Sequence, residues 1–177
     1  MKNNVQLQKL VLGASLTALS VVIDVFFKVL LQIPNFGLPF YAIPIIIGAI
    51  MLGPVYGGIM ALVGDAVAVL IVGVGYLPLF ALGSMMWGIV PGLLLYKRYN
   101  AFRLASVIFL SYLLASSINT IAITVYYTVQ ASIPWFILRM TLIPFNSLII
   151  FHVVKDLHKK LIPVFERSPL SKVNIKA

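Results

Sequence analysis

Long apolar runs, separated by short polar turns, dominate the chain. Six segments have the character of helices in a lipid bilayer, at about residues 10–31, 41–53, 56–73, 79–96, 104–128 and 134–155. A helix needs about 20 apolar residues to cross the bilayer core, so the second segment is short. Membrane β-barrels instead alternate apolar and polar residues along each strand. The pattern therefore predicts an all-α, polytopic membrane protein with six transmembrane helices.

The composition agrees with this fold class. Hydrophobic residues make up 62% of the 177 residues and charged residues only 10%, and the mean hydropathy is +1.08. Soluble domains carry about a quarter charged residues. The chain has no cysteine and two histidines, which leaves no disulfide framework, no thiol nucleophile and no convincing metal site. Because no nucleotide-binding or catalytic motif is evident either, we expect neither an enzyme nor a bound cofactor.

The N-terminal segment has two interpretations. Its basic start and apolar run resemble a signal peptide. The apolar run nevertheless continues to about Leu31, contains Asp24 and Lys28, and lacks a clear small-residue cleavage site. We therefore predict a retained first helix, one substrate-binding domain over residues 1–160, and a short polar tail over residues 161–177.

The basic residues predict the orientation of the helices. Lysines and arginines precede the first segment, flank the loop between the fourth and fifth, and follow the sixth. The loops after the first, third and fifth segments carry none. The positive-inside rule then places both termini in the cytoplasm. The net charge of +9 also favours anionic lipid. Since the basic residues are scattered over three juxtamembrane segments, we expect no nucleic-acid partner.

Four charged side chains fall inside the apolar segments: Asp24, Lys28, Asp65 and Arg139. Such groups are costly in lipid and mark functional sites by default. Asp24 and Lys28 are four residues apart in the favourable order, which predicts an ion pair on one helix face. Asp65 lies among glycines and alanines that permit close helix contact. It is expected either to bond a neighbouring helix or to contact a ligand.

Arg139 is the strongest candidate for a ligand anchor. Its guanidinium stays charged, and it lies about five residues inside the last apolar segment. At about 1.5 Å per residue it would sit roughly 7–8 Å below the outer interface. It therefore needs an anion nearby, which is Asp24, Asp65 or the carboxylate of a bound molecule.

Several polar and aromatic residues are expected at a similar depth. They are Asn119 and Tyr126, seven apart on one helix face, together with Trp135, Tyr76 and Asn35 near the outer loops. This set predicts a small aromatic-lined cavity that opens outward and holds an acidic ligand by one cation. The alternative is an ordinary aromatic belt with one structural salt bridge.

The first apolar segment carries a pair of small residues, Ala14 and Ala18, four positions apart. Such pairs let another helix approach closely. Several features of the chain are typical of one known family. They are this alanine pair, the chain length, the six helices, and the stretches IPIIIGAIMLGPVYGGIMALVGD and LRMTLIP. Over about residues 10–155 the chain resembles the substrate-binding S components of energy-coupling factor (ECF) vitamin transporters, with the folate-type subgroup the most similar.

The resemblance implies a mechanism and a set of partners. An S component of the prokaryotic plasma membrane captures a vitamin outside, and its small-residue face, here Ala14 and Ala18, docks onto a transmembrane coupling subunit. Two ATPase subunits drive the cycle, in which the S component topples within the membrane. The chain alone would then bind its vitamin without concentrating it.

The choice of vitamin follows from one difference between this chain and the folate-specific members of the family. Folate-specific members carry an arginine late in the first helix, where this chain has Asp24 and Val25. A smaller monoanion with hydroxyl and amide groups suits one arginine better, so pantothenate is the first choice. Folate, and a precursor of the hydroxymethylpyrimidine or pyridoxine type, are alternatives. A structural or assembly protein of the membrane, without a ligand, is the alternative from another functional class.

Overall fold

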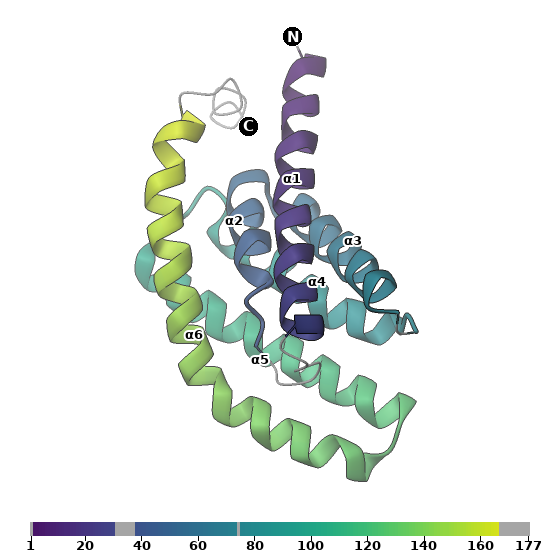
Figure 1. Ribbon diagram of the computed structural model, residues 1–177. Coiled ribbons are helices and arrows are strands. Elements are labelled where there is room, and N and C mark those ends of the chain that lie inside the picture. Colours follow the sequence, from purple (N-terminus) through teal and green to yellow (C-terminus); the bar gives the residue numbers. More distant parts are fainter. Residues whose placement is uncertain (1, 31–37, 74, 167–177) are drawn as a thin grey trace.

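The computed structural model describes residues 2–30, 38–73 and 75–166, and over these ranges the chain is helical and contains no strand (Figure 1). The predicted all-α fold is confirmed. In chain order the helices are α1 (Lys2–Val25), continued by the π-helical turn η1 (Phe26–Leu30), then α2 (Ala42–Leu52), α3 (Pro54–Val72), α4 (Pro78–Leu95), α5 (Ala101–Tyr126) and α6 (Val129–Glu166).

Local sequence signals set several of the helix ends. Pro54 and Pro78 occupy the first turns of α3 and α4, where a missing backbone N–H costs nothing. Gly73 ends α3 with a φ of 77°, a left-handed conformation that glycine adopts without strain. The side chain of Asn100 caps α5 by accepting a hydrogen bond from the backbone N–H of Phe102 at 3.0 Å.

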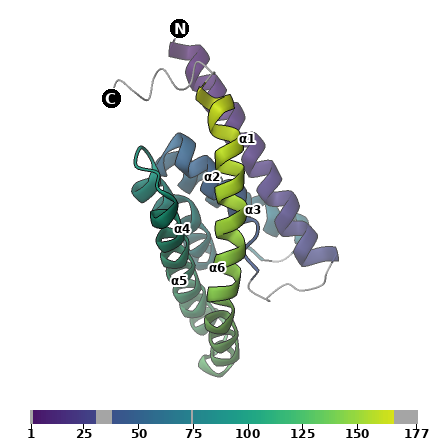
Figure 2. The ribbon, with the colours of Figure 1, turned by 90° about the vertical axis from the view of Figure 1, so that its left-hand side faces the viewer.

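The helices pack in a definite order around the short helix α2. Helix α3 packs against α1 and α4, α4 against α5, and α5 against α6, while α2 touches α1, α3, α4 and α6. The start of α1 and the end of α6 lie at the same end of the bundle in both views (Figures 1 and 2). Almost every residue of α2 is buried, so α2 forms the centre of the core with Trp87, Ile108 and Ile150.

Helices α3 and α4 approach each other through glycine. A Cβ atom on Gly88 of α4 would collide with the backbone carbonyl of Gly57 of α3, and a Cβ on Gly57 would meet the carbonyl of Gly88. Side chains at these positions would therefore force the two backbones apart. The close contact matters for the site, because α3 and α4 carry two of its polar residues further along.

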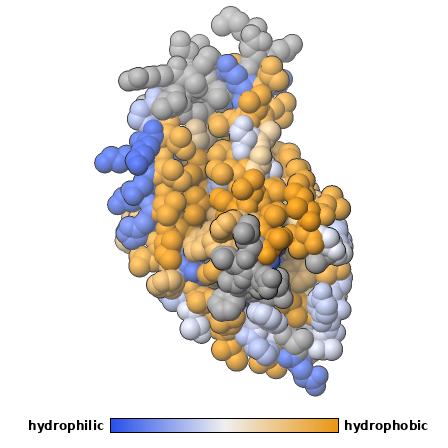
Figure 3. All heavy atoms as spheres, viewed as in Figure 1, coloured by the Kyte–Doolittle hydropathy of each residue, from blue (hydrophilic) through white to orange (hydrophobic). Residues whose placement is uncertain are grey.

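Among the described residues, five helices are long and apolar enough to cross a membrane, in the ranges Val5–Val29, Pro54–Val72, Pro78–Leu95, Ala101–Tyr126 and Ser132–Leu161. Helix α2 has 11 residues, which span about 16 Å, so it is a partial span. Apolar side chains cover much of the face in Figure 3, as expected of a surface whose solvent is lipid. The sequence thus predicted all six helices, including the short second one.

The ends of two helices differ from the sequence-based expectation. Helix α1 begins at Lys2 rather than near residue 10, and α6 runs from Val129 to Glu166 rather than from 134 to 155. The first residues of the predicted polar tail, 161–166, therefore belong to α6. Hydropathy locates the part of a helix that lies in lipid, and it does not register the turns that continue into water. Helix α6 also bends in Figure 1, and Pro144 lies within it.

Candidate functional site

A cavity of about 770 Å³ occupies the half of the bundle away from the start of α1 and the end of α6. This volume is in the range of about 300–1,000 Å³ that small-molecule sites usually have. Every helix except α2 contributes to its walls, and α2 is represented by the residues just before it. Its aromatic lining consists of Phe27, Tyr41, Phe80, Trp87, Tyr112, Tyr127 and Trp135.

Arg139 reaches the cavity from α6 and is only 8% exposed. Its Nη1 atom is buried and has no hydrogen-bond partner among the described residues. Asp24 and Asp65 are both described, and neither forms an ion pair with it. Since α6 begins at Val129, Arg139 lies ten residues into the helix, about 15 Å along its axis. The structure therefore holds a buried cation that forms no ion pair with a described acid.

Asn119 lines the cavity from α5 and packs against α4. Its amide oxygen faces Gly83 so closely that a Cβ atom there would collide with it. That oxygen is buried and has no hydrogen-bond partner among the described residues. The amide group of Asn119 is thus placed by its packing against α4 rather than by a hydrogen bond to a described residue.

The deep wall of the cavity is built from Trp87 of α4 and Tyr112 of α5, whose ring centroids are 5.4 Å apart. Both side chains are almost completely buried. The Tyr112 hydroxyl accepts a hydrogen bond of 2.9 Å from the Asn146 side chain on α6. This bond joins α5 to α6, the helix that carries Arg139. The wall is therefore fixed by both packing and hydrogen bonding.

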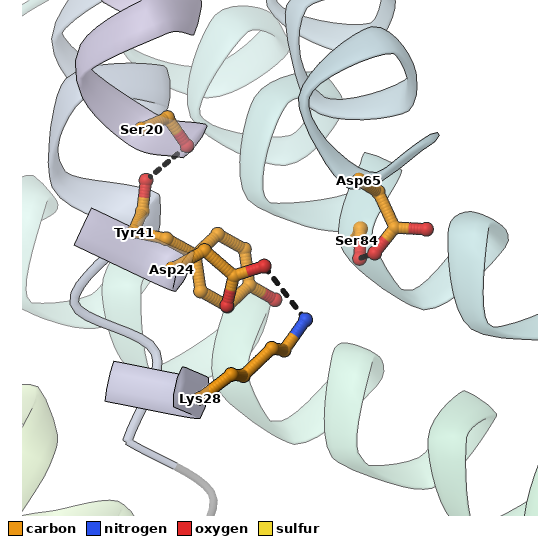
Figure 4. Close-up of polar contacts among 6 residues, drawn as sticks. All are labelled: Ser20, Asp24, Lys28, Tyr41, Asp65 and Ser84. Atoms are coloured by element: carbon orange, nitrogen blue, oxygen red, sulfur yellow. Dashed lines mark hydrogen bonds and ion pairs between the residues drawn. The ribbon is translucent and has the colours of Figure 1, made fainter. Parts of the chain in front are cut away.

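The end of α1 supplies the predicted ion pair. Lys28, in η1, donates to Asp24 at 2.7 Å, and both side chains line the cavity (Figure 4). Nearby, the Ser20 hydroxyl donates to the backbone carbonyl of Tyr41 at 2.7 Å. That bond ties α1 to the residue preceding α2. It helps to hold Tyr41 beside the cavity, which this residue lines.

The acid on α3 has a different partner. The Ser84 hydroxyl of α4 donates to Oδ1 of Asp65 at 2.9 Å (Figure 4). The other carboxylate oxygen, Oδ2, has no hydrogen bond to a described residue. Both side chains line the cavity. Asp65 thus bonds a neighbouring helix and also faces the space where a ligand would lie.

The structure brings together four of the seven predicted pocket residues: Arg139, Asn119, Trp135 and Asp65 all line the cavity. Tyr126 and Tyr76 are not among its lining residues. The Tyr126 ring stacks on Phe80, which does line the cavity, with centroids 6.3 Å apart. Tyr76 is 42% exposed. Asn35 lies outside the described residues. The roles of all seven in binding stay predictions.

Sequence reasoning did not single out Tyr41, Ser84, Trp87 or Tyr112 for the cavity. Trp87 and Tyr112 lie in the middle of apolar segments, far from the interfaces where such rings gather. Their position in the middle of apolar segments could have identified these two residues as cavity candidates. The sequence offers no such signal for Ser84, because its partner Asp65 lies on another helix.

The small-residue pair on α1 is accessible. Ala14 and Ala18 are exposed, whereas Gly13 and Thr17 on the same helix are buried. Gly13 and Thr17 instead belong to the contact between α1 and the rest of the bundle, where Thr17 donates to the carbonyl of Gly13 at 2.8 Å. The described residues contain no cluster of acidic or histidine side chains that could hold a metal ion.

A comparison with known families gives one match. The family model for the substrate-specific component of ECF transporters matches residues 8–163. The matched region includes the two exposed alanines of α1 and all the residues that line the cavity. Neither the curated proteins nor the solved structures contain a significant match to this chain.

Proposed function

Because the chain belongs to the family of substrate-specific components of ECF transporters, we propose that it captures an acidic B-group vitamin, with pantothenate as the first choice. It is a multi-pass protein of the cell membrane and a transporter component, and its family is not an enzyme family. In the proposed cycle the vitamin enters the cavity from outside the cell and is delivered inward with the help of an ATP-driven module.

The observation that carries the proposal is the buried guanidinium of Arg139 in the cavity wall, which forms no ion pair with a described acid and whose Nη1 atom has no hydrogen-bond partner among the described residues. Moving a charge from water into such a site costs several kcal/mol unless an anion compensates it. The acids Asp24 and Asp65 do not do so, since they bond Lys28 and Ser84. A ligand carboxylate at Arg139 would supply the missing anion through charge-assisted hydrogen bonds.

Pantothenate fits the remaining polar groups. It is a monoanion whose amide and hydroxyl groups can bond side chains such as Asn119. Among the described residues that line the cavity, Arg139 is the cation that is free for a carboxylate, because Lys28 is engaged by Asp24. A dianion such as folate would need a second cation.

The aromatic lining favours a second candidate. Seven aromatic side chains of the described residues line the cavity, and aromatic rings prefer to stack against other flat groups. Folate, or a smaller heteroaromatic vitamin precursor of the hydroxymethylpyrimidine or pyridoxine type, would use these rings more fully than pantothenate. Folate also has a carboxylate for Arg139, whereas the smaller precursors lack one.

The partners follow from the family and from α1. We infer a transmembrane coupling subunit that docks on the exposed alanines Ala14 and Ala18, together with two ATPase subunits that drive transport. The start of α1 and the end of α6, which share one end of the bundle, would face the cytoplasm with their lysines. The cavity, at the other end, would then face outward.

The test is a thermal-shift panel on the detergent-solubilised protein with pantothenate, folate, pyridoxine and hydroxymethylpyrimidine. We expect pantothenate to give the largest rise in melting temperature, because a ligand stabilises the state that binds it. A largest rise with folate or with a heteroaromatic precursor would replace the first choice. Folded protein that responds to none of the four would contradict a vitamin-binding role and favour a structural or assembly protein.

A further inference from the structure

The cavity has a second charged wall that the proposed function does not use. We propose that Asp65, oriented by Ser84, binds the hydrogen-bond donors of the ligand at the end opposite its carboxylate, so that the site selects molecules with an acid at one end and donors at the other. This inference rests on the proposed function and concerns the same cavity. It names the class of ligand more narrowly.

The two charges reach the cavity from helices that are not neighbours. Asp65 belongs to α3, which packs against α1, α2 and α4, and Arg139 belongs to α6, which packs against α5 and α2. Both side chains line the cavity, and no ion pair joins these two described residues. An elongated ligand in the cavity can therefore touch both walls at once.

The carboxylate of Asp65 retains the capacity to accept further hydrogen bonds. A carboxylate can accept about four, and Asp65 accepts one, from Ser84 at 2.9 Å. Lys28, in η1, is a candidate cation for Asp65, but it is bonded to Asp24 at 2.7 Å (Figure 4). Among the described residues, nothing else bonds the Asp65 carboxylate. Donors from a ligand would supply bonds that the protein does not.

Ser84 explains why Asp65 is suited to this task. The side chain of Ser84 is buried, and its hydroxyl donates to one carboxylate oxygen. The bond fixes the orientation of the carboxylate and spares Oδ2 for another partner. If Asp65 served only to tie α3 to α4, this single bond would be its whole function. The two roles predict different effects on ligands that differ at their donor end.

The inference separates the candidate vitamins by chemistry. Pantothenate has a carboxylate at one end and two hydroxyl groups at the other. Folate has carboxylates at one end and amino and ring N–H donors at the other. Pyridoxine and hydroxymethylpyrimidine have donors without a carboxylate, so they can use Asp65 but not Arg139. We therefore expect the site to prefer the first two over the latter two.

The test compares two probes on the purified protein: pantothenate, and the pantothenate analogue in which both hydroxyl groups are replaced by hydrogen. Affinities are measured by titration for the wild type, Asp65→Asn and Ser84→Ala. Asp156→Asn is the matched control, because Asp156 is an exposed acid of α6 outside the cavity. The melting temperature of each variant without ligand shows that it is folded.

We expect Asp65→Asn to weaken pantothenate binding about tenfold, as the loss of a hydrogen bond to a charged group implies. The affinity for the analogue should fall less than about twofold in Asp65→Asn, since the analogue has no hydroxyl group to place at Asp65. Ser84→Ala should show the same selective loss, and it keeps the test decisive if Asp65→Asn does not fold. Asp156→Asn should leave both affinities unchanged.

Equal losses for both probes would mean that Asp65 acts only on the fold, and unchanged affinities would mean that it does not touch the ligand. Either result overturns the inference and leaves the proposed vitamin role intact. If the wild type binds folate and not pantothenate, folate and its analogue without the 2-amino group replace the two probes, with the same criteria. Wild-type protein that binds neither vitamin overturns the inference together with the proposed role.

Discussion

The amide oxygen of Asn119 on α5 lies directly against Gly83 on α4, in the space that a Cβ atom would need. This contact places a polar side chain in the cavity wall without any hydrogen bond to a described residue. A substitution at Gly83, a residue with no side chain, should therefore change ligand binding.

We expect Gly83→Ala to weaken vitamin binding about tenfold, because the added methyl group displaces the Asn119 amide. Gly64→Ala on α3 is the matched control. A Cβ at Gly64 would meet its neighbours at 3.6 Å or more, which is ordinary contact, and Gly64 does not line the cavity. Titration of both variants with the same vitamin checks the prediction. If Gly83→Ala binds the vitamin with the same affinity as the wild type, Asn119 does not contact the ligand.

The anchor role of Arg139 predicts a loss of affinity without a loss of stability. A charge-assisted hydrogen bond contributes roughly 1.5–3 kcal/mol, so Arg139→Ala should weaken binding of an acidic vitamin by about ten- to a hundredfold. Arg139→Lys should recover only part of this, since a point charge lacks the two-pronged geometry of guanidinium. Arg103→Ala, which removes an exposed arginine of α5, should have no effect.

The melting temperature of the same variant without ligand is the second readout. Because no ion pair joins Arg139 to Asp24 or Asp65, all three being described, Arg139→Ala leaves no acid unpaired. We expect the ligand-free melting temperature to stay the same or rise. A marked fall would indicate a structural role for the arginine, and unchanged vitamin affinity would refute the anchor assignment.

The exposed pair Ala14 and Ala18 predicts where the coupling subunit docks. The double substitution Ala14→Trp, Ala18→Trp should prevent a helix from approaching α1 closely, while vitamin binding survives because neither residue lines the cavity. Co-purification with the coupling subunit and the two ATPases measures docking, and Ala105→Trp on the exposed face of α5 is the control. An intact complex with the double variant would contradict the assignment.

The energy source predicts the behaviour of the isolated chain. Because the sequence has no nucleotide-binding motif, the protein reconstituted alone in liposomes should bind its vitamin and not concentrate it. Uptake of radiolabelled vitamin, with and without ATP, provides the measurement. ATP-dependent accumulation against a gradient by this chain alone would rule out the need for a separate coupling module.

The absence of cysteine makes the orientation easy to test with single-cysteine variants. Tyr76 and Lys159 are both exposed and lie near opposite ends of the bundle. A membrane-impermeant maleimide should label Tyr76→Cys in intact cells, because the positive-inside rule places that loop outside. Lys159→Cys should react only after the membrane is permeabilised. The reverse pattern would invert the proposed topology.

The sequence alone predicted the helices well, but it misplaced the start of α1 and both ends of α6. Apolar runs identify the part of each helix that lies in lipid, since backbone groups there must bond within the helix. The added turns at the start of α1 and the end of α6 lie beyond those runs. Asp24 and Lys28 were also predictable as a pair, because their spacing on one helix determines their contact.

What the sequence by itself determined is thus local: the membrane class, the six helices, the Asp24–Lys28 pair, and the presence of costly charges at Asp65 and Arg139. Only the tertiary structure decided what those charges meet. Asp65 bonds Ser84 of α4, and Arg139 bonds neither acid in the described part of the cavity. The physical reason is that these contacts depend on which helices pack together and at what depth. No spacing along one helix encodes that arrangement.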